Sequence, residues 1–182
     1  MVSPISCLSI LVIPLLVTSL FYQVSNACVN ATYLDRICNQ SSSYELCKST
    51  FASDNRTSTA DLTDLLLISY SSNMNLLETT IANRIPKILE LLNDPLDKAR
   101  LQNCQTDFIY ALGKLSGAYL ASSSKNYRKA VNLTTDAYVK NVECEKEYDT
   151  TNRASPIADV PQNVTGLIFV SYAILHEIPP PT

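Results

Sequence analysis

Two apolar stripes with helical spacing, separated by a short polar turn, constrain the fold of this chain more than any other feature. Between residues 101 and 148, apolar side chains recur at steps of three and four on both sides of Ser122-Ser123-Ser124. Because so short a turn cannot hold a crossover, the two predicted helices run antiparallel. Each stripe contains one cysteine, Cys104 or Cys144, and both lie roughly 30 Å from the turn. A disulfide between them would close the open end of this hairpin, and the chain-entropy model values it at roughly 4 kcal/mol.

Length and composition favour one all-α domain. The 182 residues can bury a proper core, and the chain contains only three glycines, which argues against a turn-rich β fold. The formal net charge is −3 and no basic stripe is present, which argues against a nucleic-acid partner.

The first 27 residues have the features of a secretory signal peptide. They contain no charged side chain, Leu8–Leu20 is an apolar run of suitable length, and Ser25 and Ala27 place small residues before a cleavage site. The alternative is a signal anchor, because Cys7–Val24 is nearly long enough to span a bilayer and no Lys or Arg precedes it. A proline inside the run and the small residues at its end favour cleavage after Ala27.

Five Asn-x-Ser/Thr sequons also indicate the secretory route. Each alone could arise by chance, and one of them lies inside a helical pattern. Together with the leader they predict a secreted glycoprotein. Because that compartment oxidises thiols, we expect the cysteines to pair rather than to bind metal. The sequons begin at Asn30, Asn39, Asn55, Asn132 and Asn163.

A second cysteine pair follows the leader. Cys38 and Cys47 flank a polar run, and their spacing suits two short helical arms joined by a turn. A disulfide that closes this loop is worth roughly 2.7 kcal/mol in the same entropy model. The mature chain has five cysteines, so spacing alone leaves several pairings open. We expect Cys28, the first mature residue, to be the unpaired one.

Two further helical patterns complete a four-helix bundle. The first begins at Thr59, with Asp61 in its first turn, and runs to Leu92; Pro86 near its end predicts a kink or break. The second covers 164–178 after a long polar loop, and it is nearly apolar all round. It is too short for a membrane span, so we expect a helix buried on several sides.

The sequence gives little support for a catalytic site. His176 is the only histidine, and no nucleophile accompanies it at a recognised spacing. Glu143, Glu145 and Glu147 alternate, but on a helix this spacing spreads them around the surface. Zinc sites need clustered Cys and His, which are absent. We therefore expect no enzyme activity, no metal and no cofactor.

Several short motifs occur in one order along residues 28–182. They are Ile37-Cys38, Tyr44-Glu45-Leu46-Cys47, Thr59-Ala60-Asp61-Leu62, Asn103-Cys104, Lys125-Asn126-Tyr127 and Glu143-Cys144-Glu145. With this order and cysteine spacing the chain resembles the plant invertase and pectin methylesterase inhibitors. The resemblance implies disulfides Cys38–Cys47 and Cys104–Cys144, a helical hairpin over about 28–58, and an antiparallel bundle over about 59–178.

The resemblance also implies a protein target. Members of this family dock bundle helices over the active-site cleft of pectin methylesterase, or of cell-wall or vacuolar invertase. Invertase inhibitors commonly present Pro-Lys-Phe where this chain has Tyr127-Arg128-Lys129, which favours pectin methylesterase. Glu143-Cys144-Glu145, in contrast, is more similar to the invertase inhibitors of the family. The expected location is the apoplast or cell wall, with the vacuole as the alternative.

The turn over 122–129 is the candidate contact. Tyr127 could be an aromatic anchor, while Lys125, Arg128 and Lys129 could meet acidic groups in a sugar-processing cleft. The alternative is that Tyr127 packs in the core and the basic residues are simply solvated. A function of another class, a secreted bundle that binds a small ligand or receptor, would need a large apolar cavity between the helices.

Overall fold

The structure, a computed structural model, describes residues 31–149 and 153–178, and these are helical apart from their turns. The predicted leader, Cys28 and Asn30 lie outside the described residues. No helix within the described ranges is both long and apolar enough to cross a membrane.

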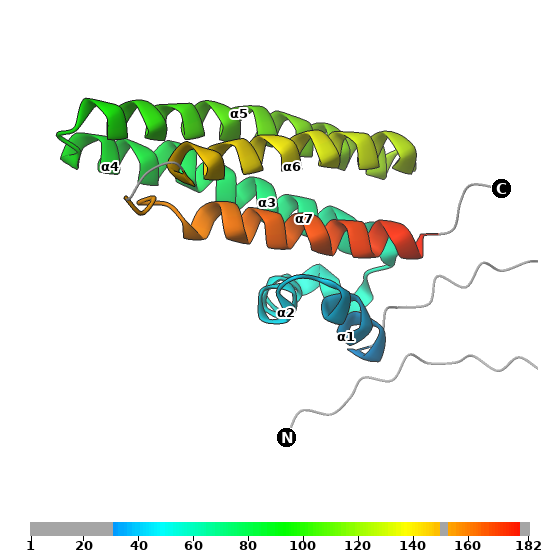
Figure 1. The fold of residues 1–182 in the computed structure, drawn as a ribbon. Coiled ribbons are helices and arrows are strands. Elements are labelled where there is room, and N and C mark those ends of the chain that lie inside the picture. The colour runs from blue at the N-terminus through cyan, green and yellow to red at the C-terminus, as the bar shows by residue number, and fades with distance from the viewer. Residues whose placement is uncertain (1–30, 150–152, 179–182) are drawn as a thin grey trace, which may run out of the picture.

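Four long helices form an up-and-down antiparallel bundle, and a helical hairpin packs against one side of it (Figure 1). The predicted all-α bundle with a preceding hairpin is confirmed. The hairpin, α1 and α2, contacts α7 and α3, whereas α5 and α6 form the opposite layer. The elements are α1 (Ala31–Gln40), α2 (Tyr44–Ala52), the 3₁₀ turn η1 (Asn55–Thr59), α3 (Leu62–Thr79), the π-helical turn η2 (Thr80–Arg84), α4 (Ile85–Leu91), α5 (Pro95–Ser123), α6 (Tyr127–Asp149) and α7 (Asp159–Glu177).

The first bundle helix begins three residues later than the sequence suggested. Thr59 is the last residue of η1, and Asp61 caps α3 from outside rather than lying in its first turn. The Asp61 carboxylate accepts the backbone N–H of Asp64 at 2.8 Å, and the Asp64 carboxylate accepts the backbone N–H of Asp61 at 3.2 Å. This reciprocal capping box satisfies two donors that the helix would otherwise leave free, so it sets the start at Leu62.

Prolines shape the other end of the bundle. Pro86 has no N–H to donate and its ring conflicts with the preceding turn, so the chain widens into η2 and restarts as α4, with Pro86 in its first turn. The irregularity lies where the sequence predicted a kink or break. The last helix begins at Asp159, five residues before the predicted Val164, because Pro161 fits a first turn, where its missing N–H would have no partner.

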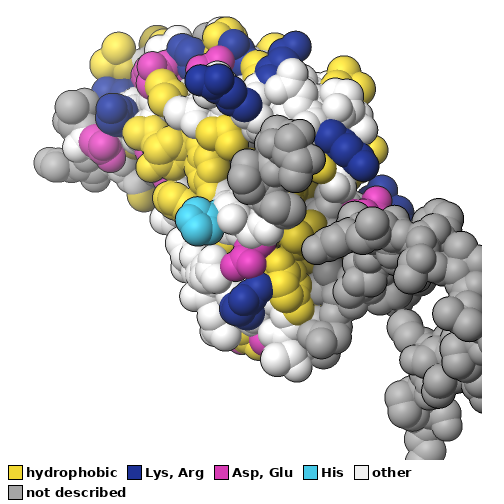
Figure 2. Space-filling model, turned by 90° about the vertical axis from the view of Figure 1, so that its right-hand side faces the viewer, with side chains coloured by type: hydrophobic (Ala, Val, Ile, Leu, Met, Phe, Trp, Pro, Cys, Tyr) yellow, Lys and Arg dark blue, Asp and Glu magenta, His cyan; other side chains and the backbone are white. Residues whose placement is uncertain are grey.

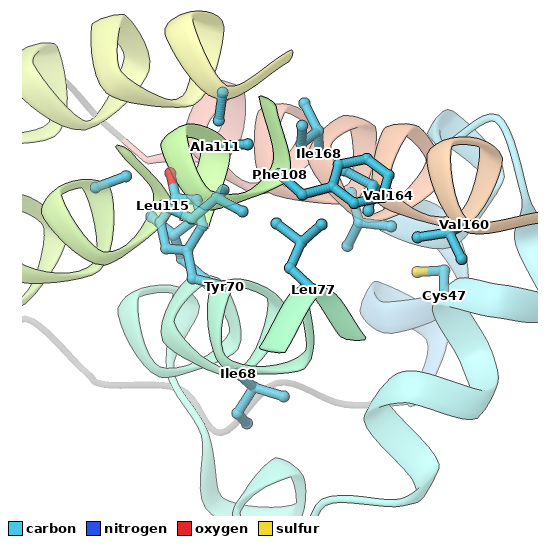
Figure 3. Close-up of a cluster of buried hydrophobic side chains, with 14 of the residues drawn as sticks. Cys47, Ile68, Tyr70, Leu77, Phe108, Ala111, Leu115, Val160, Val164 and Ile168 are labelled. Carbon is cyan, nitrogen blue, oxygen red and sulfur yellow. The ribbon is translucent and has the colours of Figure 1, made fainter. Parts of the chain in front are cut away.

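The core lies between α3, α5 and α7, while α6 packs closely on α5. Leu77, Phe108 and Val164 are fully buried and lie together in Figure 3. On α6 the buried side chains include Ala130 and Ala137.

Both predicted disulfides are present. Cys104 and Cys144 join α5 to α6 with their Cα atoms 4.5 Å apart, and Cys38 and Cys47 join α1 to α2 with a Cα separation of 5.4 Å. All four cysteines are buried. The pairing implied by the family resemblance is therefore the one that the structure contains.

Hydrogen bonds made by buried polar side chains join the helices in pairs. Because a buried donor without a partner costs about 1–3 kcal/mol, these bonds favour one pairing and register of the helices. Asn73, which interrupts the apolar stripe of α3, is one of them. The bonds join Ser69 to Ser171 (2.9 Å), Tyr70 to Thr134 (2.8 Å), Asn73 Nδ2 to the Val164 carbonyl (3.2 Å) and Asn141 Nδ2 to the Pro161 carbonyl (2.9 Å).

Candidate functional site

The turn between α5 and α6 lies at the end of the bundle where α3 begins and α7 ends (Figure 1). The Lys125 N–H donates to the Ser122 carbonyl at 2.9 Å, and the Asn126 N–H donates to the Ala121 carbonyl at 2.8 Å, which together end α5. The Asn126 side-chain oxygen then accepts the Lys129 N–H at 3.2 Å and caps α6. Hydrogen bonds on both sides therefore hold this turn between the two helices.

Three cations lie on this turn, and we call Lys125, Arg128 and Lys129 the basic tip. All three side chains are exposed, and none has a described Asp or Glu oxygen within 4.0 Å. By contrast, eight of the other eleven Lys and Arg residues, all within the described ranges, form ion pairs. The positive charge of the tip is thus free to act on a partner.

Lys125 adopts a backbone conformation that favours glycine. Its φ is 58°, and it is the only non-glycine residue with positive φ in the part of the chain that the structure describes. Glycine usually occupies this position after a helix, because it has no Cβ to clash with the backbone there. A lysine at this position therefore keeps a charged side chain at the expense of local stability.

Arg128 and Lys129 oppose the local helix field. They lie in the first turn of α6, where the partial positive charge of the helix N-terminus disfavours cations. Lys125 follows the C-terminus of α5, where the partial negative charge of the helix favours a cation. This one favourable interaction offsets only part of the unfavourable interaction of Arg128 and Lys129 with the start of α6.

Figure 2 looks onto this end of the bundle, and Lys and Arg side chains gather over its upper part beside apolar surface, with some Asp and Glu side chains among them. Leu120, one turn before the tip, is 63% exposed and adds an apolar group to it. Leu120 was not among the contact residues predicted from the sequence, although its position off the buried stripe of α5 was the available signal.

Tyr127 is turned toward the bundle. It is half-buried against the core, and its hydroxyl lies 2.8 Å from the Thr63 hydroxyl of α3. This geometry favours the packing interpretation of Tyr127 over the anchor interpretation. Tyr127 attaches the turn to α3, and the three cations are left to face outward.

The described sequons differ in accessibility. Asn39 on α1, Asn55 on η1 and Asn132 on α6 are exposed, whereas Asn163 on α7 is half-buried. The hydroxyl of Thr165, the third residue of the last sequon, accepts a hydrogen bond from buried Asn141 at 2.9 Å.

The other titratable residues within 31–149 and 153–178 do not converge on a catalytic arrangement. His176 is exposed at the end of α7. Glu143 pairs with Lys140 at 2.5 Å, and Glu147 accepts a hydrogen bond from Asn103 at 3.1 Å. Among the described residues no group of three or more His, Cys, Asp or Glu could hold a metal ion.

Two hollows on the surface are lined by charged groups. One, of about 380 Å³, lies beside Glu145 and Arg153, and the other, of about 430 Å³, lies beside Asp107 and Glu143. Burial raises the pKa of Asp107 and of Glu145. Neither hollow is the large apolar cavity between helices that a ligand-binding bundle would need.

The sequence model that describes plant invertase/pectin methylesterase inhibitors matches residues 32–174. The chain belongs to this family. Members are inhibitors rather than enzymes, so this inhibitor acts on a target of the pectin methylesterase/invertase kind.

Solved structures agree on the fold of this inhibitor. It is similar to a mutant form A of a pectin methylesterase inhibitor from Arabidopsis, with a TM-score of 0.70, 16% identity, and coverage of 80% of this chain and 97% of that one. It is also similar to a pectin methylesterase inhibitor from Arabidopsis thaliana, with a TM-score of 0.62, 16% identity, and coverage of 84% and 99%. No curated protein sequence matches it.

Proposed function

We propose that this protein is a secreted inhibitor of pectin methylesterase that places its basic tip and the adjoining α5–α6 surface over the enzyme's active-site cleft. The observation that carries the proposal is the tip itself. It offers three cations that form no ion pair with any described residue, and one of them is held in a backbone conformation that costs stability. Local rules broken without a structural gain are expected at functional sites.

A rigid scaffold supports this role. Binding then need not include the cost of ordering the chain. The Cys104–Cys144 bridge joins the two helices that carry the tip, and the bond from Tyr127 to Thr63 attaches the turn to a third helix. Cations presented in this way suit acidic groups in a cleft that processes sugars, because opposite charges raise the association rate and favour one orientation.

Pectin methylesterase is the preferred target because α6 begins with Tyr127-Arg128-Lys129 and lacks the Pro-Lys-Phe of many invertase inhibitors. Glu143-Cys144-Glu145 favours the alternative, an inhibitor of cell-wall or vacuolar invertase. The leader over 1–27 and the sequons support secretion to the apoplast or cell wall. A ligand-binding bundle is disfavoured by the charged lining of the two hollows.

Side-by-side inhibition of a pectin methylesterase and an acid invertase tests the proposal. We expect wild-type protein to inhibit the esterase, and the Arg128→Ala, Lys129→Ala double variant to inhibit it at least about tenfold more weakly, the effect of losing about 1.4 kcal/mol. Lys87→Ala, Lys98→Ala is the matched control, because both lysines lack ion pairs among the described residues and lie near the other end of the bundle.

The outcomes separate the parts of the proposal. Inhibition of neither enzyme by correctly folded wild-type protein that carries no N-glycan would refute the inhibitor function. Inhibition of invertase alone would replace the target. Equal inhibition by the tip variant and the control variant would reject the tip as the contact site.

A further inference from the structure

We propose that an N-linked glycan on Asn132 covers the basic tip and thereby switches the inhibitor off. The inference rests on the proposed function, because it assigns a regulation to the same site. It joins two features that the sequence alone left separate: a sequon within a helix and a cluster of unpaired cations.

Asn132 shares one face of α6 with the tip. It follows Lys129 by three residues and Arg128 by four, and residues at these separations are neighbours on a helix surface. The Cβ atoms of such neighbours lie roughly 6 Å apart. All three side chains are exposed, and the Asn132 amide forms no hydrogen bond to another described residue. A group attached to Asn132 would therefore lie directly beside both cations.

The rest of this sequon indicates when the sugar is added. Thr134 is fully buried, and its hydroxyl bonds to the Tyr70 hydroxyl at 2.8 Å and to the Ala130 carbonyl at 2.8 Å. In the folded protein an enzyme that must grip this threonine cannot reach it. Modification of Asn132 therefore takes place before α6 packs into the bundle. After folding, an Asn132 that was not modified stays unmodified, because Thr134 is buried.

The donor is an oligosaccharide carried on a polyprenyl diphosphate. The Asn132 amide nitrogen forms a bond to C1 of the first sugar, while the bond between C1 and the diphosphate oxygen breaks. The lipid diphosphate leaves, and the amide proton passes to a base of the transferase. Because Asn132 faces outward, the product can fold normally.

The attached glycan would act as a steric cover. It is bulky and hydrated, and it is larger than either neighbouring side chain. An enzyme cleft that must reach Arg128 and Lys129 would meet the sugar first. Asn39, in contrast, lies on the α1–α2 hairpin, so a glycan there leaves the tip open. The fraction of chains modified at Asn132 would then set how much active inhibitor a cell secretes.

The experiment compares wild-type protein, Asn132→Gln and Asn39→Gln, each secreted from the same eukaryotic host. Mass spectrometry of peptides after enzymatic release of N-glycans in ¹⁸O water determines which asparagines were modified. The glycosylated wild-type fraction and the two variants are then titrated against the enzyme that the unmodified protein inhibits. Glutamine is a good helix former, so Asn132→Gln retains the helix, which thermal unfolding verifies.

We expect modified Asn132 in part of the wild-type protein, and inhibition by Asn132→Gln at least about tenfold stronger than by the fraction glycosylated there. Asn39→Gln should inhibit as wild type does. An unmodified Asn132, or equal inhibition by the glycosylated fraction and Asn132→Gln, would overturn the inference while leaving the inhibitor function intact. If Asn132→Gln inhibits neither enzyme, the proposed function fails and the inference falls with it.

Discussion

At the scale of single residues, Lys125 departs most clearly from what stability alone would select. Its φ of 58° lies in the left-handed region, and its backbone bonds are those of a standard helix ending that glycine normally completes. The sequence identified Lys125 as a candidate contact because of its charge. It could not identify the strained backbone, because no glycine or asparagine stands at this position to indicate it.

Substitution of Lys125 by glycine separates function from stability. We expect Lys125→Gly to raise the free energy of unfolding by about 0.5–1 kcal/mol, since the clash of the lysine Cβ with the backbone disappears. The same change should weaken inhibition, because one of three free cations is lost. Urea unfolding and inhibition titrations measure the two effects, with Lys87→Gly in the exposed face of α4 as a control that should lower stability instead. A less stable Lys125→Gly variant would contradict the argument.

At the scale of elements, periodicity predicted the helices well but their ends poorly. The steps of three and four residues identified every long bundle helix, because burial of one face is a property of the sequence pattern itself. The ends depend on competing caps. Thr59 and Asp61 are both good capping residues, and only the reciprocal bond to Asp64 decides between them. Pro161 suggested a loop, yet the structure accommodates it in a first turn.

The glycines give a paired prediction at this scale. A Cβ added at exposed Gly113 would meet nothing within 4 Å, whereas a Cβ at buried Gly166 would lie 2.8 Å from Leu46 Cδ2 of the hairpin. Gly113→Ala should therefore stabilise the protein by about 0.5–1 kcal/mol through helix propensity alone. Gly166→Val should destabilise it by about 1–3 kcal/mol through overpacking and should speed hydrogen exchange in α1 and α2. Protection of the hairpin that stays unchanged in Gly166→Val would show that this contact is unimportant.

The junction of η2 with α7 should be sensitive to acid. Arg84 donates to both Asp159 carboxylate oxygens at 2.7 Å, and these bonds hold the pKa of Asp159 below its usual value of 3.8. A lowered folded-state pKa contributes stability above the unfolded-state pKa, and this stability is lost as the pH falls through the folded-state pKa.

The stability difference between wild type and Arg84→Gln should therefore be larger at pH 6 than below pH 3. Urea midpoints at the two pH values measure it. The bond from Arg84 to the Pro156 carbonyl does not titrate, so part of the difference should remain in acid. Equal differences at both pH values would show that the carboxylate contributes nothing through its charge.

At the scale of the whole molecule, charge is distributed unevenly. The chain carries a formal net charge of −3, yet one end of the bundle presents, in five consecutive residues, three cations that pair with no carboxylate in the described part of the chain. The sequence showed the basic cluster, but only the tertiary structure shows that none of its three cations has a described Asp or Glu oxygen within 4.0 Å. Such an asymmetry orients a protein as it approaches a partner of opposite local charge.

This asymmetry predicts how inhibition should depend on salt. If the basic tip steers the approach to an acidic cleft, the association rate constant should fall as ionic strength rises from 0.01 M to 1 M, because the Debye length shrinks from about 30 Å to about 3 Å. Arg128→Gln, Lys129→Gln should associate more slowly than wild type at low salt and at nearly the same rate at high salt, since screening removes the advantage of the cations. Stopped-flow or surface-binding kinetics with the inhibited enzyme measure both rates, and Lys87→Gln, Lys98→Gln should follow the wild-type curve more closely. The ratio of the wild-type to the tip-variant association rate constant could instead stay the same across this range of ionic strength. The two cations would then act through short-range contacts alone, and the steering role of the tip would be rejected.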